Sequence, residues 1–109
     1  MQSFTLVIYG SPESQSSSTA LNYARALLKN GHEIYRLFFY QDGVLNACSF
    51  NTPTQEDENL PASWQALIQE GSIDAVVCVA SAIKRGIVNE SEAQRFELSA
   101  SNLREGFFF

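Results

Sequence analysis

The sequence has little positive charge and only one histidine. Its 109 residues carry seven Lys and Arg against twelve Asp and Glu, which gives a formal net charge of −5. Repulsion from phosphate opposes direct binding to nucleic acid, and no basic cluster offsets that repulsion. A metal site built on two histidines is excluded, because His32 is the only one.

Long apolar runs and a cysteine framework are also missing. No run approaches the length that spans a membrane, and the first residues lack the basic and apolar regions of a signal peptide. Cys48 and Cys78 form neither a C-x-x-C motif nor a zinc-ligand spacing. A single disulfide between them stays open as an alternative, but nothing else indicates secretion. We therefore expect a cytoplasmic protein that does not bind membranes.

Apolar and aromatic residues are plentiful. Hydrophobic residues make up 45% of the chain, including eight Phe, four Tyr and one Trp, which is typical of a globular protein. The length suits one domain, residues 1–109. A domain of this size has little interior, so the apolar surplus also indicates a surface that meets a partner.

Strand-like and helix-like segments alternate along the chain. Three short β-rich runs predict strands at residues 4–9, 33–40 and 73–79. Apolar spacing and capping residues predict helices after the serine-rich loop, at residues 62–70, and at about 90–98. This order predicts an α/β fold: a single three-layer domain with a mainly parallel sheet and helices on both faces. The apolar pattern of the second predicted strand is continuous, which predicts that this strand is covered on both faces.

Cys78 lies at the most informative junction. A buried, β-branched run ends at this residue, and a segment rich in small residues that carries Lys84 and Arg85 follows it. A thiol held between a strand and the positive end of a short helix has a lowered pKa and is a usable nucleophile. The alternative stays open that Cys78 is simply a small buried hydrophobe.

In open α/β sheets, ligands gather beyond the carboxyl ends of the strands. Residues 10–18, 40–47 and 78–85 follow the three predicted strands, so we expect these segments to meet at that edge. The serine-rich loop at 10–18 would cradle an anion, as in a flavodoxin-like FMN-binding reductase, or simply cap a helix. It lacks the glycines of known phosphate loops, which favours the cap.

The other polar residues fit structural roles better than chemical ones. Cys48 lies in the long irregular segment at 41–59 and is interpreted as an incidental thiol. His32 follows a turn glycine, which favours a solvated surface position. Asp42 is interpreted as a turn former, and the acidic run Glu56-Asp57-Glu58 as a solvated face. A hydrolase built on paired carboxylates is not supported.

Four segments together resemble the DsrE-like family of sulfur-relay proteins. Their order and spacing match nearly the whole chain, which makes the resemblance much more specific than any single motif. The segments are Leu6-Val7-Ile8-Tyr9-Gly10-Ser11-Pro12, Leu37-Phe38-Phe39-Tyr40-Gln41-Asp42-Gly43-Val44-Leu45-Asn46-Ala47, Cys78-Val79-Ala80-Ser81-Ala82-Ile83-Lys84-Arg85-Gly86-Ile87-Val88 and Ala100-Ser101-Asn102-Leu103-Arg104-Glu105-Gly106-Phe107.

The resemblance implies a sulfurtransferase that accepts persulfide sulfur on Cys78 and passes it to a thiol of an acceptor protein. No metal or organic cofactor is implied. The implied partners are a protein sulfur donor and acceptor, with TusB-like and TusC-like subunits in a heterohexamer. The relay serves 2-thiouridine formation in tRNA or, in relatives, dissimilatory sulfur oxidation. A non-catalytic interaction subunit is a further alternative, against which Cys78 argues.

The chain departs from the family pattern at two places. Cys48 falls where no cysteine is required, which agrees with an incidental thiol. Family members continue past Gly106-Phe107 with a turn, a helix and a closing strand. We therefore expect that the C-terminal end of this sequence is truncated.

Overall fold

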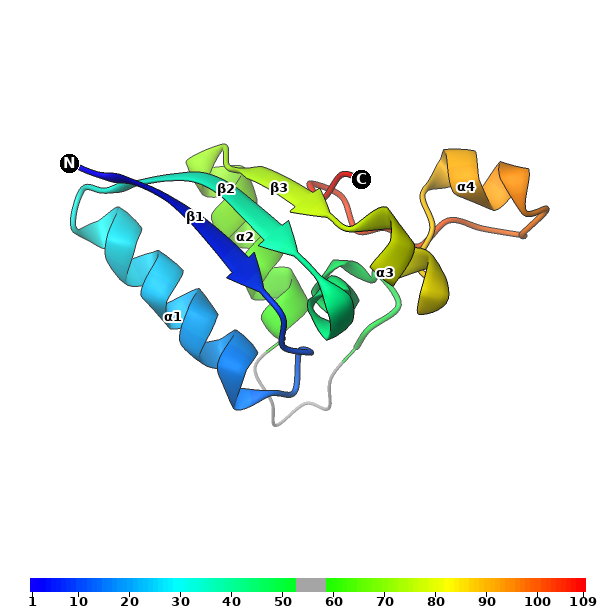
Figure 1. Ribbon diagram of the computed structural model, residues 1–109, viewed down its shortest axis with the longest axis horizontal. Helices are drawn as coiled ribbons and strands as arrows, with labels where there is room; N and C mark the ends of the chain where they lie inside the picture. Colours follow the sequence, from blue (N-terminus) through cyan, green and yellow to red (C-terminus); the bar gives the residue numbers. More distant parts are fainter. Residues whose placement is uncertain (53–58) are drawn as a thin grey trace.

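The computed structural model describes residues 1–52 and 59–109. Within these ranges the chain forms three strands, four α-helices and one 3₁₀ helix (Figure 1). In chain order these are β1 (Ser3–Ile8), α1 (Gln15–Lys29), β2 (Glu33–Phe39), η1 (Gln41–Ala47), α2 (Leu60–Gly71), β3 (Asp74–Val77), α3 (Val79–Lys84) and α4 (Glu90–Arg95). The predicted alternation of strands and helices is confirmed.

The strands form a parallel sheet in the order β1-β2-β3. The register of β1 against β2 shifts between Phe4 and Thr5, where β2 has one extra residue. Leu37 of β2 pairs with Leu6 of β1 on one side and with Ala75 of β3 on the other. The α/β class and the parallel sheet are therefore as the sequence predicts.

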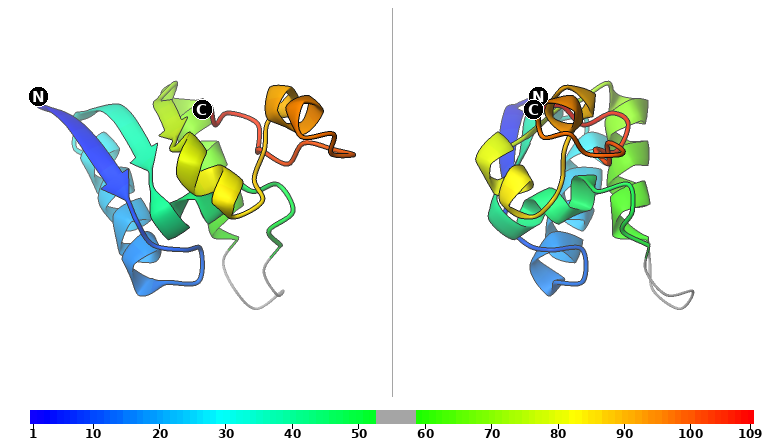
Figure 2. Two further views of the ribbon diagram at one scale, coloured as in Figure 1. Left: turned by 45° about the vertical axis from the view of Figure 1, so that its right-hand side comes forward. Right: turned by 90° about the vertical axis from the view of Figure 1, so that its right-hand side faces the viewer.

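One face of the sheet carries the core. Alternate strand residues point to this face, and α1 and α2 both pack against it (Figures 1 and 2). Trp64 of α2 is fully buried and meets the ring of Phe39 edge-on at a centroid distance of 5.5 Å. Ser14 caps α1 by accepting from the amide of Ser17, and Asn59 caps α2 in the same way. Local capping and the apolar faces of the helices thus fix this layer.

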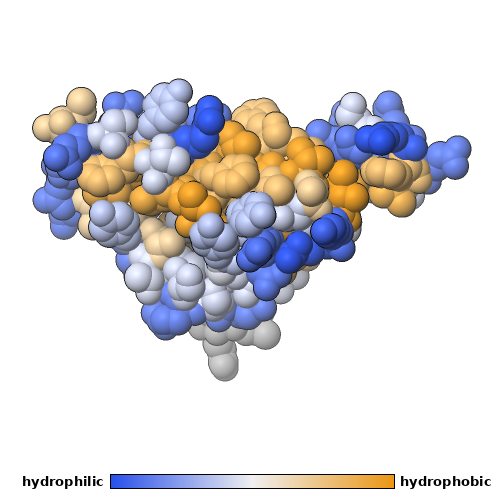
Figure 3. Space-filling model, viewed as in Figure 1, coloured by the Kyte–Doolittle hydropathy of each residue, from blue (hydrophilic) through white to orange (hydrophobic). Residues whose placement is uncertain are grey.

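The opposite face of the sheet is open within the described residues, contrary to the prediction of a three-layer domain with helices on both faces. Val7, Tyr35 and Phe108 are 47, 60 and 63% exposed on it, and Figure 3 shows apolar side chains gathered over the strands on this side. Two right-handed crossovers that move in the same direction across a sheet place both helices on one face. The order β1-β2-β3 therefore leaves the second face uncovered by α1 and α2.

The last residues extend the sheet beside β3. Val76 and Phe108 form a parallel bridge, and the amide of Phe108 donates to the carbonyl of Ala75 at 3.0 Å. Phe107 enters the core and meets Phe39 at 5.2 Å between ring centroids. Phe107 and Phe109 thus pack against the core, whereas Phe108 stays exposed. Among the described residues, none of the helices is both long and apolar enough to cross a bilayer.

Candidate functional site

The segments that follow the three strands meet at the carboxyl edge of the sheet, as predicted. The amide of Tyr40 donates to the carbonyl of Ile8 at 3.0 Å, and the amide of Cys78 donates to the carbonyl of Phe39 at 3.0 Å. Residues 41–47, expected to be irregular, form η1 at this edge. Gly43 permits the approach, because a Cβ there would collide with the carbonyl of Ile8.

A buried polar network joins these segments beneath the edge. The side-chain amide of Asn46, in η1, donates to the carbonyls of Gly10 and Gly43 at 3.1 and 3.0 Å. Its side-chain oxygen accepts from the hydroxyl of Ser17 at 3.3 Å, and that hydroxyl oxygen accepts from the indole N–H of Trp64 at 3.4 Å. Asn46, Ser17 and Trp64 are all fully buried. The network therefore ties η1 to the loop after β1 and to both long helices.

Cys78 occupies the junction that the sequence predicts, directly after β3 and at the N-cap position of α3. Its amide is bound to β2, and its carbonyl accepts from the amide of Ala82 at 2.9 Å, so both sides of its backbone are held. The residue is partly exposed. Val77 points to the core, so strand alternation directs Cys78 toward the open face of the sheet. The thiol is free and not bonded to Cys48.

The surroundings of Cys78 lower the pKa of its thiol below the ordinary value. The largest cause is the nearby Ser81 hydroxyl, followed by the Ser81 amide, because both groups favour the thiolate over the neutral thiol. Partial burial opposes these effects, while the Ala80 amide and the charge of Arg85 add to them. These groups act at short range, although the sulfur makes no regular side-chain cap hydrogen bond with α3. The donors therefore stabilise the thiolate, as the nucleophile interpretation requires.

Two cations were predicted near Cys78. The charge of Arg85 lowers the pKa of the Cys78 thiol, whereas the side chain of Lys84 is exposed. The Nε of Arg85 lies 3.0 Å from Oδ1 of Asp42, and one terminal nitrogen donates to the Ser81 carbonyl at 3.0 Å. Asp42 therefore links η1 to α3 in addition to its place in the turn. This ion pair lies beside the thiolate position.

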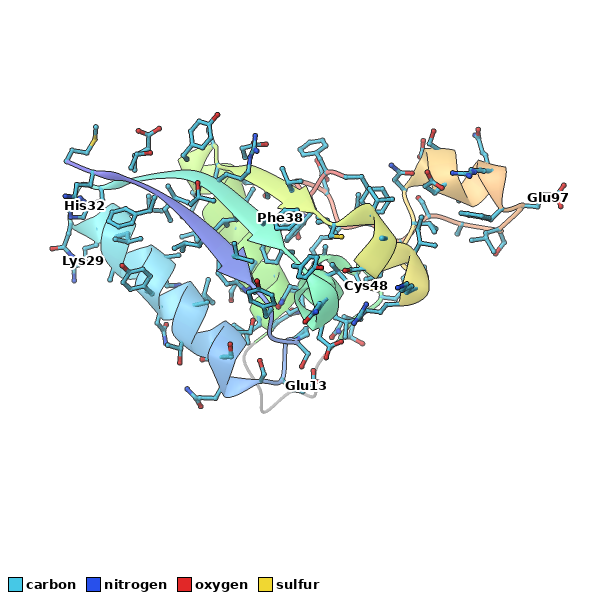
Figure 4. The ribbon with its side chains drawn as sticks, in the orientation of Figure 1. Glu13, Lys29, His32, Phe38, Cys48 and Glu97 are labelled. Atoms are coloured by element: carbon cyan, nitrogen blue, oxygen red, sulfur yellow. The ribbon has the colours of Figure 1, made fainter. Side chains whose placement is uncertain are left out.

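The remaining candidates lie elsewhere or have structural partners. Cys48 follows η1 and is partly buried, and its sulfur accepts from the side-chain amide of Asn102 at 3.8 Å. His32 precedes β2, at the end of the sheet away from α3 (Figure 4), and its Nδ1 accepts from the amide of Gln2. The acidic run at 56–58 lies outside the described residues. Among the described residues, no group of three or more His, Cys, Asp and Glu side chains is placed to hold a metal ion.

The serine-rich loop supplies a helix cap and a buried hydroxyl. Ser14 accepts from the Ser17 amide at 3.1 Å and donates to the Ser11 carbonyl at 2.8 Å. Ser17 belongs to the buried network below the sheet edge. These contacts favour the capping interpretation over a phosphate cradle.

Comparison with known proteins identifies the family. Residues 2–104 match the model of the DsrE/DsrF-like family. The chain belongs to the DsrE/DsrF-like family. Among curated members, a sulfurtransferase TusD homolog of Pseudomonas aeruginosa is 42% identical over 100 residues, covering 92% of this chain and 76% of the relative. Sulfurtransferase TusD of an Enterobacter species is 41% identical over 105 residues, covering 95% of this chain and 82% of that one.

Another member of the DsrE/DsrF-like family carries a different name. The putative sulfurtransferase DsrE of Allochromatium vinosum is 44% identical over 105 residues, covering 95% of this chain and 81% of the relative. The crystal structure of the ychN protein from E. coli superposes with a TM-score of 0.75 at 22% identity, over 100% of this chain and 84% of that one. The fold is thus shared, and these curated relatives are named sulfurtransferases.

Sequence reasoning found Cys78 in this DsrE/DsrF-like chain but missed Ser81, the residue that lowers the pKa of its thiol most. Ser81 lies three residues after the N-cap position, the spacing at which a side chain on the first helical turn reaches back to the cap. The pattern Cys78-x-x-Ser81 was therefore a usable signal. Asn46 carried no comparable local signal, because its partners are distant in sequence.

Proposed function

We propose that this chain is a sulfurtransferase subunit that accepts a persulfide sulfur on Cys78 and passes it to an acceptor protein. The observation that carries the proposal is the stabilised thiolate of Cys78 at a partly exposed junction. The names of the relatives at 41–44% identity support the same reaction class.

In the first step, the Cys78 thiolate attacks the terminal sulfur of a donor persulfide. A sulfur–sulfur bond forms to Cys78, the bond inside the donor persulfide breaks, and the donor leaves as a thiolate. The transferred sulfur keeps its oxidation state, so no external oxidant or reductant takes part. The Ser81 hydroxyl and amide stabilise the attacking thiolate.

In the second step, an acceptor thiolate attacks the outer sulfur of the Cys78 persulfide. The Cys78 thiolate is now the leaving group, and a thiol with a lowered pKa leaves faster. The Ser81 hydroxyl and amide therefore help both half-reactions. One cysteine suffices, and neither a metal nor an organic cofactor takes part in either step.

The proposal extends to the partners and the pathway. A protein donor and a protein acceptor must each reach the partly exposed sulfur, and the acidic charge favours proteins over nucleic acid. We propose TusB-like and TusC-like subunits in a heterohexamer, and sulfur delivery for tRNA 2-thiouridine. The cytoplasm would keep both cysteines reduced.

Sulfur traffic in dissimilatory sulfur oxidation is a second candidate. The 44% identity to the putative sulfurtransferase DsrE of Allochromatium vinosum favours it. The two pathways use the same chemistry at Cys78 and differ in the acceptor. Loss of 2-thiouridine from tRNA after deletion of the gene would favour the first pathway, and unchanged tRNA would favour the second.

Persulfide loading tests the proposal. The chain is incubated with a cysteine desulfurase, cysteine and an upstream carrier, and its intact mass is measured. We expect the wild type to gain one sulfur atom that a reducing agent removes. Cys78→Ser should gain none, whereas the matched variant Cys48→Ser should gain it like the wild type. No gain on the wild type, or an equal gain on Cys78→Ser, would contradict the proposal.

A further inference from the structure

Gln41 has an unusual backbone conformation beside Cys78. Its φ angle is +52°, in the left-handed region that residues other than glycine rarely adopt. It is the first residue of η1, separated from the end of β2 by Tyr40 alone, and its side chain is exposed. Such a conformation persists only where surrounding contacts hold it, and it clusters at functional sites.

The contact that this conformation makes is with Ser81. The amide of Gln41 donates to Oγ of Ser81 at 3.1 Å, and Ser81 is buried in α3. A serine hydroxyl has a single proton to donate. Because the Gln41 amide occupies an acceptor position on Oγ, that proton is directed to another acceptor. Cys78 lies one helical turn earlier, at the cap of the same helix.

We propose that the left-handed backbone of Gln41 is a positioning device that aims the Ser81 hydroxyl at the sulfur of Cys78. The inference rests on the proposed role of Cys78 and adds the residue that prepares its thiolate. Gln41 does not touch the sulfur, so it acts through Ser81. Its side-chain identity matters little, whereas its ability to hold a positive φ matters greatly.

The charged groups around the thiol do not replace this device. Arg85, at the C-cap of α3, is the charged side chain that lowers the pKa of Cys78, and its contribution is smaller than that of Ser81. Its partner Asp42, from η1, is largely exposed. The ion pair holds η1 against α3, whereas the Gln41 amide fixes the orientation of the Ser81 hydroxyl.

The test compares side chains that tolerate and resist a positive φ. In a Cys48→Ser background, the rate of Cys78 alkylation by iodoacetamide is measured against pH. The midpoint is the pH at which this rate is half of its maximum. Gln41→Gly keeps the amide and accepts the conformation, so its midpoint should match that of the parent. Gln41→Val places a β-branched residue where φ is positive, which should displace the amide and raise the midpoint. We expect a rise of about half a pH unit, against about one unit for Ser81→Ala.

Two controls separate this effect from general strain. Ser72 also has a positive φ, of 50°, but it lies at the end of α2, so Ser72→Val should leave the midpoint unchanged. In a Ser81→Ala background, Gln41→Val should cause no further rise, because its route to the sulfur is gone. Circular dichroism checks folding. If the valine variant does not fold, Gln41→Thr provides the same branched Cβ with less added apolar surface.

Four results would overturn the inference. Two are an unchanged midpoint, in the folded Gln41→Val or Gln41→Thr variant or in Ser81→Ala. The other two are an equal rise with and without the Ser81 hydroxyl, and an equal rise in Ser72→Val. Alkylation does not depend on sulfur loading, so failure here is distinct from failure of the proposed transfer.

Discussion

Replacing Asn46 with alanine tests the network that positions the site. The side chain is fully buried and makes three hydrogen bonds, two to the carbonyls of Gly10 and Gly43 and one with the hydroxyl of Ser17. Each buried group left without a partner costs about 1–3 kcal/mol, and partial relaxation reduces the sum, so we expect a loss of about 4 kcal/mol. Domains of this kind have only about 5–15 kcal/mol of stability, so the loss is large.

Denaturant unfolding measures this loss. The midpoint in urea should fall with an unchanged m-value, because the surface exposed on unfolding stays the same. Asn30→Ala is the matched control: its side chain is exposed and makes one bond, to the Ala26 carbonyl. We expect that control to lose about 0.5 kcal/mol. A loss below about 1 kcal/mol in Asn46→Ala, or equal losses in both variants, would refute the reasoning.

Two further outcomes follow from the same edge of the sheet. Gly43→Ala should prevent stable folding, because the added Cβ meets the Ile8 carbonyl. Gly86 has open space around it but a positive φ, so Gly86→Ala should lose only about 1 kcal/mol of stability. Thermal unfolding separates the two variants. The lowered pKa of Cys78 means that its thiolate stabilises the folded chain. This contribution is complete above the ordinary thiol pKa of 9.0 and is lost as the pH falls through the lower pKa of the thiol in the folded chain. The stability difference between the wild type and Cys78→Ser should therefore rise with pH toward about 9, and a constant difference would contradict the lowered pKa.

Local patterns were enough to predict the strands, the long helices and the position of Cys78. The caps at Ser14 and Asn59, and the β-branched run before Cys78, act over a few residues and are visible in the sequence. Element order then gave the parallel sheet, since strands joined by helical crossovers run in the same direction. The candidate site, with Cys78 directly after β3, lies at the carboxyl edge of this sheet.

Two features depended on contacts distant in sequence and were not predicted. Residues 41–47 were expected to be irregular, and Gly43 and Asn46 are indeed poor helix formers. The position of η1 depends on contacts with Gly10 and Ser17, which are distant in sequence. The continuous apolar pattern of β2 indicated cover on both faces. Topology overrides that pattern, because both crossovers bring their helices to one side.

The contacts of Ser81 were likewise hidden. The spacing Cys78-x-x-Ser81 is visible in the sequence, but the amide that holds the Ser81 hydroxyl comes from Gln41, forty residues earlier. The positive φ of Gln41 could not be read from glutamine, which rarely adopts it. Cys78 was therefore predictable as a candidate nucleophile, whereas the donors around it could be found only from the fold.

The most direct test of the account is the location of the sulfur on the loaded protein. After incubation with a persulfide donor, the chain is digested under conditions that preserve persulfides, and the peptides that contain Cys48 and Cys78 are compared by mass. The account predicts that the added sulfur lies on Cys78 and leaves it when an acceptor thiol is supplied. Sulfur found mainly on Cys48, or equally on both cysteines, would contradict it.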